Sequence, residues 1–203
     1  MKKVLTILLG ITFSVYCYAQ TNHSYQFTVD DFLPENSVRS IFKDSKNNLW
    51  IGTDNGLLKI TGTNKQLFTI KDGLASNKVW SIEEDKSGVV WFGCYTGGIS
   101  RWNGETIEVY ATEEELGDNK IRKLYYSKKH DLMFVGGNYT FSRIKNDSIK
   151  YFRNYITRPH VIVTNFLEND TVVFALTYGK HAWRYYPEKD TAIIFSVFDE
   201  GKN

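Results

Sequence analysis

The chain contains little cysteine or proline and has no excess of charge of one sign. Its 203 residues include 2 cysteines and 3 prolines, with 25 basic and 23 acidic residues. This balance leaves no basic stripe for a phosphate backbone, which argues against a nucleic-acid partner. Because one of the two cysteines, Cys17, lies in a predicted leader, we expect no intrachain disulfide in the mature chain.

The sequence also lacks long apolar runs, apart from one at its N-terminus. A basic start is followed by an apolar run over residues 4–15 and by the triplet Cys17-Tyr18-Ala19. This order predicts a signal peptide over residues 1–19 that is cleaved after Ala19, and the run is short for a transmembrane helix. Acylation of Cys17 is the alternative. We expect export to the periplasm or the cell exterior, with membrane attachment only through a segment that would follow this sequence.

Short catalytic and metal-binding motifs are missing as well. The sequence has no Gly-x-Ser-x-Gly, phosphate loop, paired-carboxylate signature or Cys-x-x-Cys, and its 4 histidines lack the spacing of metal ligands. We therefore predict no catalytic residue, no metal and no cofactor, and a chain that is not an enzyme.

What the sequence does contain is a repeat of about 41 residues. Residues 48–59, with the core Trp50-Ile51-Gly52, recur at residues 89–100 with the core Trp91-Phe92-Gly93. Two weaker copies follow, and the aromatic residues that close the four copies keep the same period: Phe68, Tyr110, Phe152 and Phe195. A period of this length, built from short strands, is typical of β-propeller blades.

Each copy contains four apolar runs separated by turn residues, which predicts four antiparallel strands per copy. We predict an all-β fold of four such blades, at about residues 37–70, 78–111, 120–153 and 160–196. Trp50 and Trp91 should lie on second strands and fill the gaps between blades. Gly52 and Gly93 should allow the close packing that a side chain would prevent.

The predicted strands do not add up to a closed ring. Residues 25–29 resemble the outer strand of a blade but have no inner strands of their own, while the fourth copy has its own outer strand. A ring left open in this way exposes strand edges and a blade face. We therefore expect residues 20–203 to be a partial propeller, the N-terminal part of a longer protein. The alternative is a complete small propeller with a frayed first strand.

The pattern Asn-x-Val-x-x-Ile, Asp-x-x-x-x-Leu-Trp-Ile-Gly-Thr, then Asn-Gly-Leu or Gly-Gly-Ile, resembles the two-component regulator propeller repeat. The resemblance covers residues 36–110, and the third and fourth copies lack the Trp-x-Gly core. It implies the extracytoplasmic sensor region of a hybrid histidine kinase of the kind common in Bacteroidetes. It also implies a role in signal transduction, a glycan fragment as the signal, and a homodimer in the full-length protein.

Candidate ligand-binding residues lie where a propeller places its channel mouth. Two parts of each blade gather on that face: the connection between the second and third strands, and the second residue of the inner strand. Loops held on a rigid scaffold commonly bind ligands. Aromatic rings beside amides and charges suit a sugar or another small polar ligand. The candidates are Arg39, Asp54, Asn55, Trp80, Tyr95, Thr96, Arg122, Asn138, Tyr139, Tyr178, Lys180 and His181.

The sequence therefore predicts an extracytoplasmic ligand-sensing propeller that belongs to a two-component sensor. A stand-alone secreted scaffold for protein interactions is the main alternative. A propeller-based lyase is a third, and it would need a histidine with charged partners on the channel face. His181, next to Lys180, is the candidate for that role.

Overall fold

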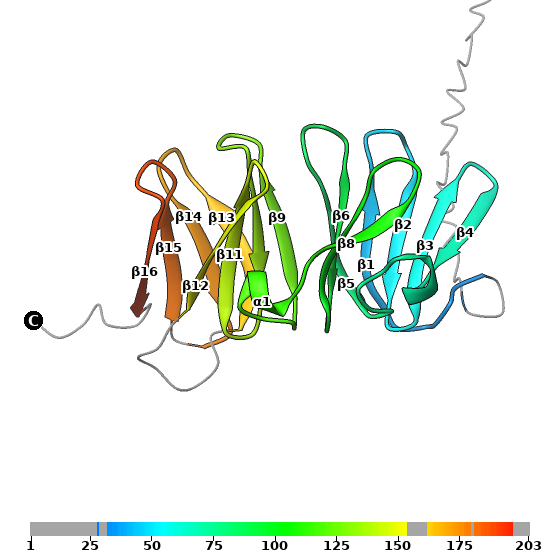
Figure 1. The fold of residues 1–203 in the computed structure, drawn as a ribbon, viewed down its shortest axis with the longest axis horizontal. Coiled ribbons are helices and arrows are strands. Elements are labelled where there is room, and N and C mark those ends of the chain that lie inside the picture. Colours follow the sequence, from blue (N-terminus) through cyan, green and yellow to red (C-terminus); the bar gives the residue numbers. More distant parts are fainter. Residues whose placement is uncertain (1–27, 29–31, 154–161, 180, 197–203) are drawn as a thin grey trace, which may run out of the picture.

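The computed structural model of this chain describes residues 28, 32–153, 162–179 and 181–196, and within them sixteen strands form four four-stranded sheets. In each sheet the strands pair antiparallel in sequence order. The predicted class of four-stranded antiparallel blades is therefore confirmed (Figure 1). The predicted signal peptide lies outside the described residues. So does the predicted outer strand at residues 25–29, except for Thr28, which is not in a strand.

The strands of each blade follow one another from the channel outward. Blade 1 consists of β1 (Val38–Lys43), β2 (Leu49–Thr53), β3 (Gly56–Thr61) and β4 (Asn64–Phe68). Blade 2 consists of β5 (Val79–Glu84), β6 (Val90–Cys94), β7 (Gly98–Trp102) and β8 (Ile107–Ala111). Blade 3 consists of β9 (Lys123–Ser127), β10 (Leu132–Gly136), β11 (Thr140–Lys145) and β12 (Ser148–Arg153). Blade 4 consists of β13 (Val163–Glu168), β14 (Val173–Thr177), β15 (His181–Tyr186) and β16 (Thr191–Ser196).

Two short helical turns connect the blades: η1 (Ile70–Asp72) and α1 (Glu113–Leu116). Both end at a glycine in the left-handed conformation, Gly73 and Gly117. Within the described ranges, no helix has the length and apolar character that a membrane span requires.

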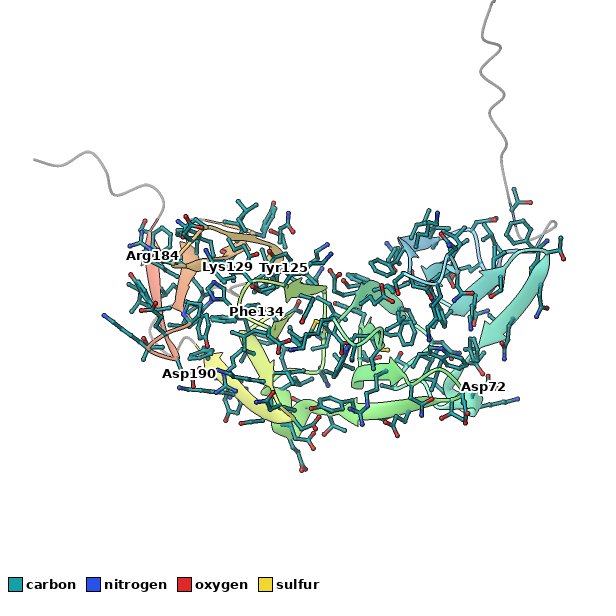
Figure 2. The ribbon with its side chains drawn as sticks, turned by 90° about the horizontal axis from the view of Figure 1, so that it is seen from above. Asp72, Tyr125, Lys129, Phe134, Arg184 and Asp190 are labelled. Atoms are coloured by element: carbon teal, nitrogen blue, oxygen red, sulfur yellow. The ribbon has the colours of Figure 1, made fainter. Side chains whose placement is uncertain are left out.

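The four blades lie along an arc, with their first strands on its inner side. Neighbouring inner strands contact one another in the order β1, β5, β9, β13. Seen from above, the described residues do not close into a ring (Figure 2). The two connections that contain η1 and α1 lie towards the lower edge in Figure 1, and we call this edge the channel-mouth face.

The tryptophan of the repeat joins a hairpin to the space between blades. Asp44 Oδ1 accepts the backbone N–H of Asn48, which closes the β1–β2 turn, and Asp44 Oδ2 accepts Trp50 Nε1 at 2.8 Å. Asp85 and Trp91 repeat this arrangement in blade 2, also at 2.8 Å. The buried indole N–H thus has an acceptor, as a buried polar group requires. This explains why the aspartate and the tryptophan recur together.

The glycine of the repeat makes room for the next blade. A Cβ on Gly52 would lie 2.5 Å from the carbonyl oxygen of Val79, the first residue of β5. A Cβ on Gly136 would lie 2.5 Å from the side chain of Val163, the first residue of β13. Blade 4 has Leu176 at the equivalent position of its second strand. The first three blades therefore approach the next blade closely at a glycine, and blade 4 has a leucine at that position.

Three hydrophobic clusters fill the blade boundaries. Trp50 is buried between blades 1 and 2, with its ring 5.2 Å from that of Phe92 and 5.8 Å from that of Trp102. Phe134, labelled in Figure 2, takes the place of the tryptophan in blade 3. Its ring lies 5.7 Å from that of Phe166 in blade 4. Blade 3, which lacks the Trp-x-Gly core, therefore packs on the next blade through a smaller aromatic ring in the same position.

Candidate functional site

A β-bulge near the start of the inner strands sets the position of the candidate side chains. The pairing of β1 with β2 shifts its register at Arg39, and the pairing of β5 with β6 shifts at Trp80. In blade 3 the equivalent residue, Arg122, directly precedes β9. A bulge re-aims the side chain of the extra residue, and it does so here at the channel mouth of the first two blades.

Asp54 links the first two blades at this face. Its Oδ2 accepts Arg39 Nε at 2.9 Å, and its Oδ1 accepts Trp80 Nε1 at 2.9 Å. The hydrogen bond from Arg39 is the main reason that the pKa of Asp54 is lowered, although partial burial opposes it. The carboxylate is therefore ionised at neutral pH and holds residues of two blades together.

Trp80 and Tyr95 form a stacked aromatic pair. Their ring centroids lie 4.0 Å apart, and the planes are inclined by 12°. The guanidinium carbon of Arg39 lies 5.0 Å from the Trp80 centroid. This distance is that of a cation–π contact. Trp80 is thus contacted by both an aromatic ring and a guanidinium group.

Arg122 and Asn138 extend the contacts to blade 3. The guanidinium of Arg122 lies 5.1 Å from both the Trp80 and the Tyr95 centroids. Its Nε donates a short hydrogen bond to the side-chain oxygen of Asn138. We call the six residues that these contacts connect the channel-mouth cluster: Arg39, Asp54, Trp80, Tyr95, Arg122 and Asn138.

Three other predicted residues lie near the cluster but make separate contacts. Asn55 is exposed in the β2–β3 turn, where its backbone N–H bonds Thr53 Oγ1 at 3.1 Å. Thr96 lies 3.1 Å from Ser76, hydroxyl to hydroxyl. Tyr139 is 43% exposed, and its backbone N–H donates to Asp118. None of these three contacts involves a member of the cluster.

The two candidates that are described in blade 4, Tyr178 and His181, form no hydrogen bond, ion pair or ring contact with the channel-mouth cluster within the described ranges. Tyr178 is 79% exposed in the β14–β15 loop. His181 begins β15, the third strand of its blade rather than the inner one. Lys180 lies outside the described residues. Because Lys180 is not described, the His181 and Lys180 pair that a lyase would use stays a prediction.

Lys78 and Lys120 are two residues at this face that the sequence pattern did not single out. The carbonyl of Lys78 accepts the backbone N–H of Tyr95 at 2.7 Å, and Lys120 forms an isolated β-bridge with Tyr95. Each directly precedes the first residue of the inner-strand motif, Val79 or Ile121. The two lysines therefore occupy the same position in successive copies of the repeat. Alignment of the copies at this position would have identified them from the sequence.

Two hollows elsewhere on the surface are less suited to a ligand. One, of about 600 Å³, lies between the outer strands of blades 2 and 3 and includes Arg101, Glu108, Tyr110 and Asp147. These groups already pair with one another, because Arg101 bonds Glu108 at 2.7 Å and Tyr110 donates to Asp147. A second hollow, of about 290 Å³, adjoins it at Asp147. In the described part of the chain, no group of three or more metal-ligating side chains is found.

Comparison with known proteins agrees with the predicted resemblance. Residues 33–55 and 73–96 match the family model of the two component regulator propeller, so the resemblance of the first two copies is confirmed. The comparison with curated proteins gives no match.

Among solved structures, the extracellular domain of the putative hybrid two component system BT3049 from B. thetaiotaomicron is similar, with a TM-score of 0.70 at 20% identity. The match covers 88% of this chain and 25% of that one. The equivalent domain of BT4673 matches with a TM-score of 0.56 at 16% identity, covering 79% and 30%. A chain of a nidogen/laminin complex matches at 0.52 with 7% identity, covering 73% and 59%. These likenesses show the fold, and this chain spans about a quarter of the length of the BT3049 domain.

Proposed function

We propose that this chain is part of the ligand-sensing propeller of an extracytoplasmic two-component sensor. We further propose that the channel-mouth cluster binds a small polar ligand, with a glycan fragment as the main candidate, and that it has no catalytic role. The extracytoplasmic location is supported by the predicted signal peptide and by similarity to extracellular domains of putative two-component systems.

The observation that supports ligand binding is a continuous set of contacts across three blades. Asp54, Tyr95 and Asn138 occupy equivalent places after the second strands of blades 1, 2 and 3. The backbone at these places is repeated, but an acid, a ring and an amide replace one another. A repeated scaffold that presents different polar and aromatic groups towards one point is the usual arrangement of a binding surface.

The chemistry of these groups suits a saccharide. The apolar face of a sugar ring packs on an aromatic side chain, while hydroxyl groups exchange hydrogen bonds with amides and guanidinium groups. Tyr95 offers the ring, and Asn138 and Arg122 offer the polar groups beside it. A ligand bound there contacts two or three blades at once.

Sensing would follow from differential binding. A ligand shifts a conformational equilibrium only by the difference between its affinities for the two states. A site that bridges blades meets this condition, because its geometry depends on how the blades are placed. In this proposal the chain supplies the binding half, and a longer protein supplies the dimer interface and the output domain.

The test is a panel of oligosaccharides added to the full chain, with the unfolding temperature as the first measurement and calorimetric titration as the second. A ligand whose concentration is about 100 times its dissociation constant stabilises the native state by about 2.7 kcal/mol. This stabilisation raises the unfolding temperature. Replacement of Tyr95 by Ala should abolish the shift. Replacement of Tyr178 by Ala is the matched control and should leave it intact, because Tyr178 is exposed and outside the cluster. A ligand that binds the Tyr95→Ala variant as tightly as the unchanged chain would contradict the proposed site.

A further inference from the structure

Two arginines occupy equivalent places in the channel-mouth cluster but have different partners. Arg39 forms an ion pair with Asp54 through Nε and a terminal nitrogen. Arg122, at the same position two blades further on, donates Nε to the neutral amide of Asn138. Within the described ranges, Arg122 forms no ion pair with a carboxylate, and its two terminal nitrogens donate to no protein acceptor.

The aromatic pair stabilises the charge of Arg122 but does not neutralise it. The guanidinium carbon lies 5.1 Å from the centroids of both Trp80 and Tyr95, within the distance of a cation–π contact. A ring has no net charge, and the amide of Asn138 has none either. The positive charge of Arg122 is therefore not paired with a carboxylate in the described residues, and the guanidinium is held in place by the rings and by Asn138.

The nearby acidic groups are already engaged by other partners. Lys78 lies close enough to Asp54 to contribute to the lowered pKa of that carboxyl group, after the larger effect of Arg39. The carboxylate of Asp54 is already paired with Arg39. Asp118 is buried, and its oxygens accept the backbone N–H groups of Lys120 and Tyr139.

We infer that Arg122 binds an anionic group of the ligand, so that the ligand is an acidic saccharide bearing a carboxylate or a sulfate rather than a neutral one. This inference rests on the proposed function, because it concerns the same site. With Nε fixed by Asn138, the two terminal nitrogens remain to donate to two oxygens of one anionic group. A guanidinium recognises carboxylates and related oxyanions in this bidentate manner. Tyr95, next to it, provides the surface for the sugar ring.

The experiment is calorimetric titration of the full chain with three oligosaccharides of equal length: an oligogalacturonate, a neutral oligogalactoside and a sulfated oligogalactoside. We expect an acidic saccharide to bind at least about tenfold more tightly than the neutral one, since a charge-assisted contact contributes only to the former. The preference should shrink as sodium chloride rises from about 50 to about 500 mM, because the contact is screened. The carboxylate and sulfate arms identify which anion the site takes.

Replacement of Arg122 by Gln should remove the preference and bring the acidic and neutral ligands to within about twofold of each other. The double change Arg101→Gln with Glu108→Gln is the matched control, because it removes an ion pair outside the cluster and leaves the net charge unchanged. It should keep the preference for the acidic ligand. Replacement of Asn138 by Ala should also keep the preference, with weaker binding, since the charge remains.

The outcomes separate this inference from the proposed function. If the neutral oligogalactoside binds as tightly as the acidic ones and binding still needs Tyr95, the inference is overturned and the proposed function stands. The inference is likewise overturned if the acidic preference survives Arg122→Gln. If none of the three saccharides binds, both are rejected.

Discussion

Trp80 Nε1 donates to Asp54 Oδ1 at 2.9 Å, across the boundary between the first two blades. Trp80 comes from the inner strand of blade 2, and Asp54 from the turn after the second strand of blade 1. The stacking partner of Trp80, Tyr95, lies in its own blade. The indole is therefore fixed both by a polar contact to the preceding blade and by an aromatic contact within its own.

This relationship predicts different effects for two changes at Trp80. Trp80→Phe keeps a ring against Tyr95 but removes the N–H, so saccharide affinity should fall only a few-fold, which corresponds to about 1 kcal/mol. Trp80→Ala removes the support of Tyr95 and should lower the affinity by more than about tenfold. Calorimetric titration of the saccharide identified in the panel measures both. Equal losses in the two variants would contradict the separate roles assigned to the ring and the N–H.

The glycine after the repeat tryptophan should be intolerant of any side chain. Gly52→Ala places a Cβ 2.5 Å from the backbone oxygen of Val79, so the first two blades must separate, at a cost of about 2–3 kcal/mol in the free energy of unfolding. Gly62→Ala is the control, because a Cβ there meets nothing within 4 Å. Its φ of +59° still costs about 1 kcal/mol. Urea denaturation of both variants measures the two losses of stability. The loss for Gly52→Ala should be the larger one, because only that Cβ meets the backbone of the next blade.

The indole N–H of Trp50 should contribute to stability separately from its ring. Trp50→Phe keeps an aromatic ring between the blades but leaves buried Asp44 without one of its donors. Together with the lost ring volume, we expect a loss of about 2–3 kcal/mol in the free energy of unfolding. The double variant Trp50→Phe with Asp44→Asn should lose less than the two single changes added together, because they remove the same contact. Additive losses would show that the hydrogen bond carries no coupling.

An ion pair between the last two blades should make stability depend on acid. Arg143 donates to both carboxylate oxygens of Asp190, at 2.8 and 2.7 Å, and this holds the pKa of Asp190 far below its ordinary value. A carboxyl group whose pKa is lowered by folding stabilises the folded state above its unfolded pKa of about 3.9. That contribution is lost as the pH falls from about 5 through the lowered folded value.

Asp190→Asn should flatten this acid dependence and should cost about 2 kcal/mol at neutral pH, because the buried Arg143 loses its charged partner. Asp170→Asn is the matched control. Asp170 pairs with Lys129 on the surface, and exposed pairs contribute little. Chemical denaturation between about pH 3 and pH 7 distinguishes the two, because the loss of stability begins within that range, as the carboxyl group of the unfolded chain starts to bind protons below about pH 5. Identical pH profiles for Asp190→Asn and the unchanged chain would refute the assignment.

Much of the fold was predictable because each copy of the repeat contains, within about 41 residues, the pattern of one whole blade. The period, the turn residues and the alternation of strands identify four blades even where the Trp-x-Gly core is missing, since Phe134 and Phe174 keep the position of the tryptophan. The topology also predicted that Arg39, Trp80 and Arg122 would lie on one face. The sequence did not show which candidates contact one another. In the described residues of blade 4, Tyr178 and His181 form no hydrogen bond, ion pair or ring contact with the cluster.

The sequence by itself determined the class of fold and the face on which variable residues gather, because both follow from periodicity along the chain. Only the tertiary structure decided which of those residues meet. The bulge at Arg39 and Trp80 depends on strand register, and the pairing of Asp54 with Trp80 depends on how one blade docks on the next. Side-chain pairing also distinguished two arginines that occupy equivalent places in the repeat. Arg39 pairs with a carboxylate of its own blade, whereas Arg122 pairs with an amide of its own blade and contacts the rings of the preceding blade.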